Sequence, residues 1–149
     1  MFSQSGGHRK QCLHNENVQT YLSLKNPNFI DWEITTIFYA SLQVVDDYLL
    51  SNHSLIPANH FERIRHVRNL IPTIRSDYNN LKMLSEKARY ISAVLPPELT
   101  AAKQYYGNIK NALQVLPWAK NLCQKQFSTP WAQAIIHNYF TQWYSELTK

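Results

Sequence analysis

The sequence predicts an all-α fold, an up-and-down bundle of four to five main helices with an additional C-terminal helix. Glycine is scarce, with three in 149 residues and two of them among the first seven. This scarcity argues against a turn-rich β protein and for long uninterrupted helices. Apolar residues recur at helical spacing through most of the chain. The length fits one domain over residues 1–149 with a single core.

The N-terminal part is predicted to hold a polar lead and a first, modest helix. Residues 1–8 contain both early glycines and are expected to be mobile. The helix is expected from Arg9 to Leu24, and it should end at the loop from Lys25 to Asn28, which contains a proline. Its apolar positions are Leu13, Val18, Tyr21 and Leu22.

The central helix is predicted over Asp31 to Asn52, with Asp31 as the N-cap. Apolar residues cover most of its circumference, which is typical of a helix packed on several sides. We therefore expect it in the middle of the bundle, in a dimer seam, or both. One side of this helix carries Trp32, Tyr39, Gln43, Asp46 and Leu50.

Two further helices are predicted on either side of Pro72. The first begins at Asn59 or Ala58 and has an apolar stripe of Phe61, Ile64, Val67 and Ile71. Pro72 should bend or restart the helix, because proline removes a backbone donor and clashes one turn back. The second helix is expected from Thr73 to about Ile91.

The last part of the chain is predicted to contain a fifth helix and an extension. Residues 94–98, with two prolines, should form a loop before a helix from Thr100 to about Leu116. The C-terminal extension, residues 117–149, is expected to end in a helix from Trp131 to Leu147, because Pro130 stands at the favoured first helical position.

Charge and composition restrict the class of protein. The formal charge is +5 with a pI near 9.3, which permits an anionic partner such as nucleic acid. Residues 60–90 form the strongest basic band. The two cysteines, Cys12 and Cys123, make no framework, so a reduced cytoplasmic setting is expected. No apolar run is long enough to span a membrane, and the N-terminus does not resemble a signal peptide.

Neither a metal nor a cofactor is expected. Asp46 and Asp47 form an acidic pair, and two neighbouring carboxylates can bind a divalent ion or act as a general acid and base. Adjacent helical residues point about 100° apart, however, so one of the two should face a buried Arg or Tyr and the other solvent. The six histidines lack zinc-site spacing, and nucleotide-binding and hydrolase motifs are absent.

The pair His60 and Arg63, one helical turn apart, is the candidate catalytic pair. Histidine can move a proton near neutral pH, and arginine can stabilise phosphate charge, so together they suit phosphodiester chemistry. The alternative is that Arg63 belongs to a solvated basic face or pairs with Asp46 or Asp47 on the neighbouring helix.

A series of motifs resembles that of small bacterial and archaeal HEPN-like proteins. The matching residues are Asp31-Trp32, Phe38-Tyr39-Ala40-Ser41-Leu42, Val45-Asp46, Tyr48-Leu49, His60, Arg63, Tyr78, Leu81, Ser85 and Ala88-Arg89-Tyr90. In those proteins the pattern is a Trp, FYAAL, an acidic helix end, a P-x-x-H-x-x-R turn and an L-x-x-x-S-x-x-A-R-Y helix. The resemblance covers about residues 14–92 and leaves out the part from Pro117 onward.

The resemblance implies a helical bundle that commonly dimerises, in a superfamily whose members cleave or bind RNA in toxin-antitoxin and antiviral systems. Its catalytic members use an Arg-x(4–6)-His motif, which occurs here only at Arg9 to His14, far from the expected late helix. Gln43 stands where relatives often carry His. Both departures favour an internal polar network in which Tyr39, Gln43 and Asp46 meet His60, Arg63 and Arg89.

The function expected from these observations is that of an RNA-associated module. Arg89 and Tyr90 would present a guanidinium and a stacking ring to RNA. A homodimer is expected, through the helix over Asp31 to Asn52 or through the last helix. The alternative is a non-catalytic bundle that binds a protein partner encoded nearby, such as a nucleotidyltransferase or an antitoxin.

Overall fold

The computed structural model describes residues 4–25 and 29–115, and these form a helical bundle. Five α-helices and two short turns follow one another: α1 (Gln4–Lys25), α2 (Ile30–His53), α3 (His60–Leu70), the 3₁₀ turn η2 (Pro72–Ile74), α4 (Arg75–Glu86), the π-helical turn η3 (Lys87–Ile91) and α5 (Pro96–Leu113). The described residues include no strand. The prediction of an all-α bundle is confirmed.

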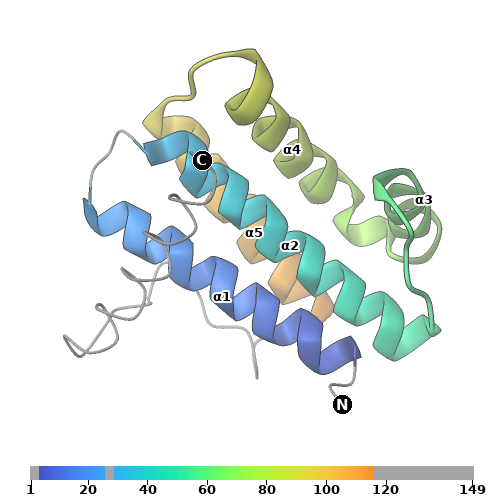
Figure 1. Cartoon of the computed structure of the whole chain (residues 1–149). Coiled ribbons are helices and arrows are strands. Elements are labelled where there is room, and N and C mark those ends of the chain that lie inside the picture. Colours follow the sequence, from blue (N-terminus) through green and yellow to red (C-terminus); the bar gives the residue numbers. More distant parts are fainter. Residues whose placement is uncertain (1–3, 26–28, 116–149) are drawn as a thin grey trace.

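Helix α2 is the centre of the bundle. It contacts α1, α4 and α5 along its length and α3 near its C-terminal half (Figure 1). Its buried apolar residues meet those of the other helices in one core, which includes Ile34, Ile37, Phe38, Val45, Leu49, Tyr78, Leu81, Tyr106 and Ile109. The expectation that this helix is packed on several sides is therefore confirmed.

The ends of α2 differ from the predicted ones. Phe29, not Asp31, is the N-cap, and it makes no side-chain capping bond. Asp31 instead lies in the first turn, where a carboxylate is favourable next to the exposed backbone amides. At the other end the helix runs to His53, and Ser54 adopts the left-handed conformation with φ of 55°. Its amide bonds to the Leu50 carbonyl, which closes the helix.

Helix α3 is capped by Asn59, one of the two residues at which its start was predicted. The Asn59 side-chain oxygen accepts a hydrogen bond of 2.9 Å from the amide of Glu62. The predicted interruption at Pro72 is also present, since α3 ends at Leu70 and the chain restarts through η2. The predicted apolar stripe is wrong at Phe61, which is 76% exposed. Arg63 of the same helix is buried instead.

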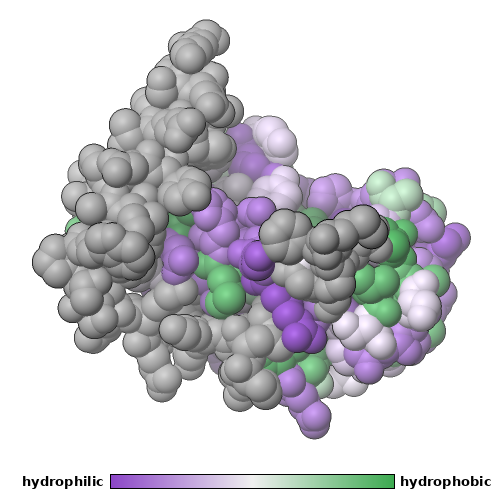
Figure 2. Space-filling view, turned by 60° about the horizontal axis from the view of Figure 1, so that its bottom comes forward, coloured by the Kyte–Doolittle hydropathy of each residue, from purple (hydrophilic) through white to green (hydrophobic). Residues whose placement is uncertain are grey.

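Apolar groups also reach the surface around α3. Figure 2 shows hydrophobic residues exposed beside hydrophilic ones at the end of the molecule that α3 and the loop before it occupy in Figure 1. Ile56 in that loop and Phe61 in α3 are both exposed.

The segment after α4 departs from a continuous α-helix. Residues 87–91, predicted as regular helix, form the π-helical turn η3. Helix α5 starts at Pro96 and not at Thr100, since the two prolines occupy its first turn, where their missing donors cost nothing. The Leu95 amide bonds to a Glu98 carboxylate oxygen at 3.1 Å, which caps this start.

Helix α1 begins at Gln4, five residues before the predicted start at Arg9. The predicted C-terminal extension, residues 117–149, lies outside the described residues. Within the part of the chain that is described, no helix combines the length and apolar character needed to cross a membrane.

Candidate functional site

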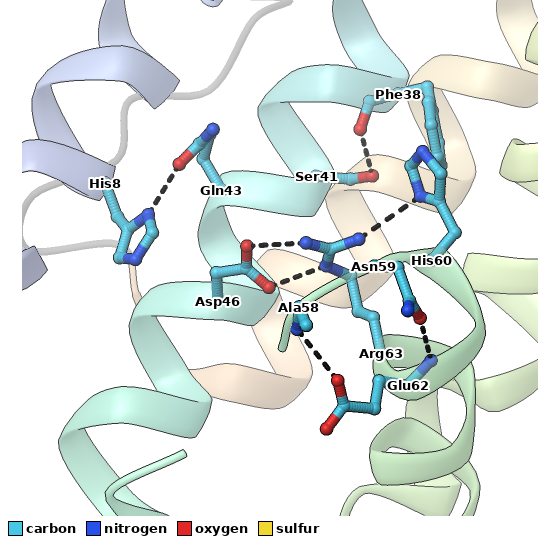
Figure 3. Close-up of polar contacts among 10 residues, drawn as sticks. All are labelled: His8, Phe38, Ser41, Gln43, Asp46, Ala58, Asn59, His60, Glu62 and Arg63. Atoms are coloured by element: carbon cyan, nitrogen blue, oxygen red, sulfur yellow. Dashed lines mark hydrogen bonds and ion pairs between the residues drawn. The ribbon is translucent and has the colours of Figure 1, made fainter. Parts of the chain in front are cut away.

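A buried ion pair between α2 and α3 is the base of the candidate site. The Nε and NH2 groups of Arg63 donate hydrogen bonds of 2.7 Å and 2.9 Å to the two carboxylate oxygens of Asp46 (Figure 3). Both side chains are about 8% exposed. Burial acts to lower the pKa of Arg63, but the hydrogen bond and charge of Asp46 outweigh it and raise that pKa above its ordinary value. The alternative in which Arg63 pairs with Asp46 is confirmed.

His60 lies next to this pair, on the first turn of α3. The NH1 group of Arg63 donates to Nδ1 of His60 over 3.2 Å, and the imidazole packs 6.1 Å from the Phe38 ring (Figure 3). Burial lowers the pKa of His60, and the charge of Arg63 lowers it further. The charges of Lys82 and Arg89 act in the same direction. His60 remains an exposed residue, whereas Arg63 is enclosed.

Arg89 on η3 is the second cationic group of the site. Its NH1 donates to the Tyr39 hydroxyl at 2.5 Å, and its Nε and NH2 groups donate to the carbonyl and hydroxyl of Ser85. The guanidinium also lies over the rings of Phe38, Tyr39 and Tyr90, at 5.9, 5.3 and 5.1 Å. Among the described residues no carboxylate pairs with Arg89, so its charge is held by hydroxyl, carbonyl and ring contacts alone.

Tyr90 is the exposed aromatic of the site. It is 76% exposed and stands on the π-helical turn beside Arg89. π-Helical turns are rare, and within α-helices they occur frequently at functional sites. The turn thus pairs an unneutralised guanidinium with an accessible ring.

The predicted polar network is confirmed in part. Asp46 meets Arg63, and Tyr39 meets Arg89. Gln43 does not join these residues, because its side-chain oxygen contacts Nδ1 of His8 on α1 at 2.7 Å.

The prediction for the acidic pair needs a correction. Asp46 faces a buried Arg as expected, but Asp47 does not face solvent. Helix α1 covers that side of α2, and Arg9 lies 3.3 Å from the Asp47 carboxylate. The two carboxylates therefore diverge to different partners, and no group of three or more His, Cys, Asp or Glu in the described residues could hold a metal ion.

A second buried polar cluster joins α1 and α5 and was not predicted. One carboxylate oxygen of Glu16 accepts hydrogen bonds of 3.0 Å from Lys110 and from the Tyr106 hydroxyl, which also contacts the Cys12 sulfur at 3.2 Å. Lys110 is 2% exposed. The sequence does indicate that Lys110 is buried. It follows Tyr106 by four residues and precedes Leu113 by three, so helical spacing places it on the apolar face of α5.

No family model matches the chain, and no curated protein or solved structure matches it. The fold and the site define an all-α bundle with a basic and aromatic surface cluster above a buried ion pair.

Proposed function

We propose that this chain is a HEPN-like, RNA-associated bundle that binds single-stranded RNA through Arg89 and Tyr90. One observation carries the proposal: a half-buried guanidinium without a carboxylate partner among the described residues lies against an exposed tyrosine ring. Proteins that bind single strands combine a cation for the phosphate backbone with a ring on which a base stacks.

Neighbouring groups support this assignment. Lys82 and Arg89 both lie close enough to His60 for their charges to act on it, so two cations meet at this place on the surface. Lys82 is itself paired with Glu86 and Arg63 with Asp46, so within residues 4–25 and 29–115 Arg89 is the arginine of this site that no carboxylate neutralises. The overall charge of +5 favours the approach of a polyanion.

The same geometry favours binding over cleavage. Two donor groups of Arg63 bond to Asp46 and a third bonds to His60, and the side chain is enclosed between α2 and α3. A catalytic arginine would have to reach phosphate in an open site. We therefore assign Arg63 and Asp46 to the support of the site and Tyr39, Arg89 and Tyr90 to its binding surface.

The setting that fits the resemblance is a toxin-antitoxin or defence system in the cytoplasm, with the chain acting as a homodimer. Light scattering of the purified chain tests the dimer, because a monomer mass at all concentrations would contradict it.

The binding test is fluorescence anisotropy with a labelled single-stranded oligoribonucleotide, measured at several salt concentrations. Loss of one stacked base costs about 1–3 kcal/mol, so Tyr90→Ala should weaken binding about fivefold or more. Arg89→Met should weaken binding and reduce its salt dependence. Equal affinity of these variants and the wild type would contradict the proposal.

Matched controls exist in the chain. Phe61 is 76% exposed, as Tyr90 is, so Phe61→Ala removes an equally accessible ring from a different helix. Arg75, exposed at the opposite end of α4 from η3, serves as the arginine control. Neither Phe61→Ala nor Arg75→Met should change affinity by more than about twofold, because surface charges and rings outside a site contribute little.

A protein-binding module is the second candidate, and a specific feature favours it. Met83, Tyr90, Ile91 and Leu95 are all exposed apolar residues within one segment around η3. Clusters of exposed apolar residues mark interaction sites. If RNA does not bind at any salt concentration, a cognate antitoxin or nucleotidyltransferase that protects this segment from hydrogen exchange would support this candidate.

A further inference from the structure

The contact between Arg63 and His60 determines which nitrogen of the imidazole carries the proton. A guanidinium has only N–H donors and accepts nothing. Its 3.2 Å contact with Nδ1 of His60 therefore requires a lone pair on Nδ1. In the neutral ring the proton must then reside on Nε2, which is the nitrogen left to contact a ligand.

Asp46 holds Arg63 in the position that makes this contact. The carboxylate uses both oxygens on the Nε and NH2 groups, so the guanidinium plane cannot rotate and NH1 is directed at the imidazole (Figure 3). His60 in turn packs on Phe38, which restricts the ring. The chain of contacts runs from α2 through α3 to the surface.

The electrostatic surroundings keep the imidazole uncharged. Three cations face it, Arg63 from α3, Lys82 from α4 and Arg89 from η3. Burial is the largest cause that lowers the pKa of His60, and these three cations lower it further, while Asp46 on α2 opposes them as the smallest contribution. Protonation of Nδ1 would also place an N–H group against an N–H group of Arg63, which removes the hydrogen bond.

We propose that Asp46 and Arg63 are positioning residues that hold His60 as the Nε2–H tautomer, a neutral hydrogen-bond donor for a phosphate oxygen of the bound strand. This inference rests on the proposed function and assigns the phosphate contact at that site. His60 then adds a directed hydrogen bond next to the charge of Arg89. It is not a general base, since its only basic nitrogen is bonded to Arg63.

The tautomer can be measured without RNA. Long-range proton-nitrogen NMR on the full chain with labelled histidine, assigned with a His60→Gln variant, reports each ring nitrogen separately. We expect Nδ1 of His60 to be unprotonated and Nε2 protonated at pH 7. A protonated Nδ1, or a charged imidazolium at this pH, would overturn the inference.

The positioning role is tested by replacing the ion pair with two apolar residues, Asp46→Leu with Arg63→Met, which keeps the fold because no buried charge is left alone. In this double variant His60 should populate both tautomers, and its pKa should rise toward the ordinary value. RNA affinity should then increase about two- to fivefold from pH 8 to pH 6, as a surface cation forms. The wild type should change less than twofold, and equal pH profiles would overturn the positioning role.

The phosphate contact has its own variants. His60→Ala should weaken RNA binding severalfold, and His60→Gln should restore part of the loss because its amide can donate in place of Nε2. His53→Ala, which removes an exposed histidine that contacts Tyr48 instead, is the control. If Arg89→Met weakens binding while His60→Ala does not, the inference fails and the proposed function stands. If RNA binds to no variant and not to the wild type, both fail.

Discussion

Asp46 and Arg63 form a bidentate ion pair, both almost enclosed between α2 and α3. The two oxygens of one side chain face two nitrogens of the other, which is the strongest geometry available to a carboxylate and a guanidinium. The pair lies 17 residues apart in the sequence and fastens the short helix α3 to the central helix. Since α3 carries His60, the same pair also orients the candidate site.

Single substitutions in this pair should be costly and a joint apolar substitution should not. Asp46→Ala or Arg63→Ala leaves one buried charge without its partner, so the free energy of unfolding should fall by about 3–5 kcal/mol. The double variant Asp46→Leu with Arg63→Met should be within about 1 kcal/mol of the wild type or more stable. Urea unfolding followed by circular dichroism measures all three.

The control for this series is Arg65, two residues along α3. Arg65 lies 3.9 Å from Glu62 at the surface, with about half of its side chain exposed. Arg65→Ala should cost less than about 1 kcal/mol, because exposed pairs contribute little. A similar loss for Arg65→Ala and Arg63→Ala would contradict the assignment of the buried pair.

Two buried tyrosines should respond differently to the loss of their hydroxyl groups. The Tyr78 hydroxyl lies near Arg63 but makes no hydrogen bond of standard geometry, whereas the Tyr106 hydroxyl bonds to Glu16 and Cys12. Tyr78→Phe should leave the free energy of unfolding unchanged or raise it by up to about 1 kcal/mol, because it removes an unsatisfied polar group. Tyr106→Phe should lower it by about 1–3 kcal/mol.

The two substitutions form their own control, since each removes one oxygen from a tyrosine at most 1% exposed. Thermal unfolding of both variants at pH 7 gives the comparison. Burial also raises the pKa of both hydroxyls, so the unfolded tyrosines ionise first and the free energy of unfolding falls as the pH rises above about 10. Equal losses for the two variants at pH 7 would contradict the difference in bonding.

The fold was predictable because helices are set by local signals. The scarcity of glycine permits long helices along the whole chain. The helix start at Asn59 or Ala58 and the break at Pro72 each depend on a few residues, and both lie where predicted. The boundaries at Gln4 and Pro96 were missed for physical reasons. Tertiary packing of α1 on α2 extends a weak N-terminal helix, and prolines can begin a helix as well as end one.

The contacts of the site could be predicted only where helical spacing and charge both indicated the same partner. Helical spacing places His60 and Arg63 one turn apart on α3, and Asp46 offers the opposite charge on the neighbouring helix α2, so their contact could be inferred. The contact of Gln43 with His8 depends on α1 starting before Arg9, and the π-helical turn at Arg89 has no sequence signal of its own. The link from Glu16 to Lys110 spans 94 residues, a separation that spacing rules do not reach.

The cap at Asn59 should contribute measurably to the stability of α3. Its side-chain oxygen satisfies the Glu62 amide, so Asn59→Ala should lower the free energy of unfolding by about 1 kcal/mol. Asn59→Asp keeps an acceptor at the same place and should cost only a few tenths of a kcal/mol. Chemical unfolding of both variants is the measurement, and an equal loss for Ala and Asp would contradict the capping role.

The pair of Glu16 and Lys110 should make the loss of the lysine alone costly. Both side chains are at most 3% exposed and lie 3.0 Å apart. In Lys110→Met the Glu16 carboxylate stays buried without this cation, so the free energy of unfolding at pH 7 should fall by about 3–5 kcal/mol. Glu16→Gln with Lys110→Met leaves no buried charge without its partner and is the control, so its loss should be less than about 1 kcal/mol. Urea unfolding of both variants is the measurement, and equal losses would sink the prediction.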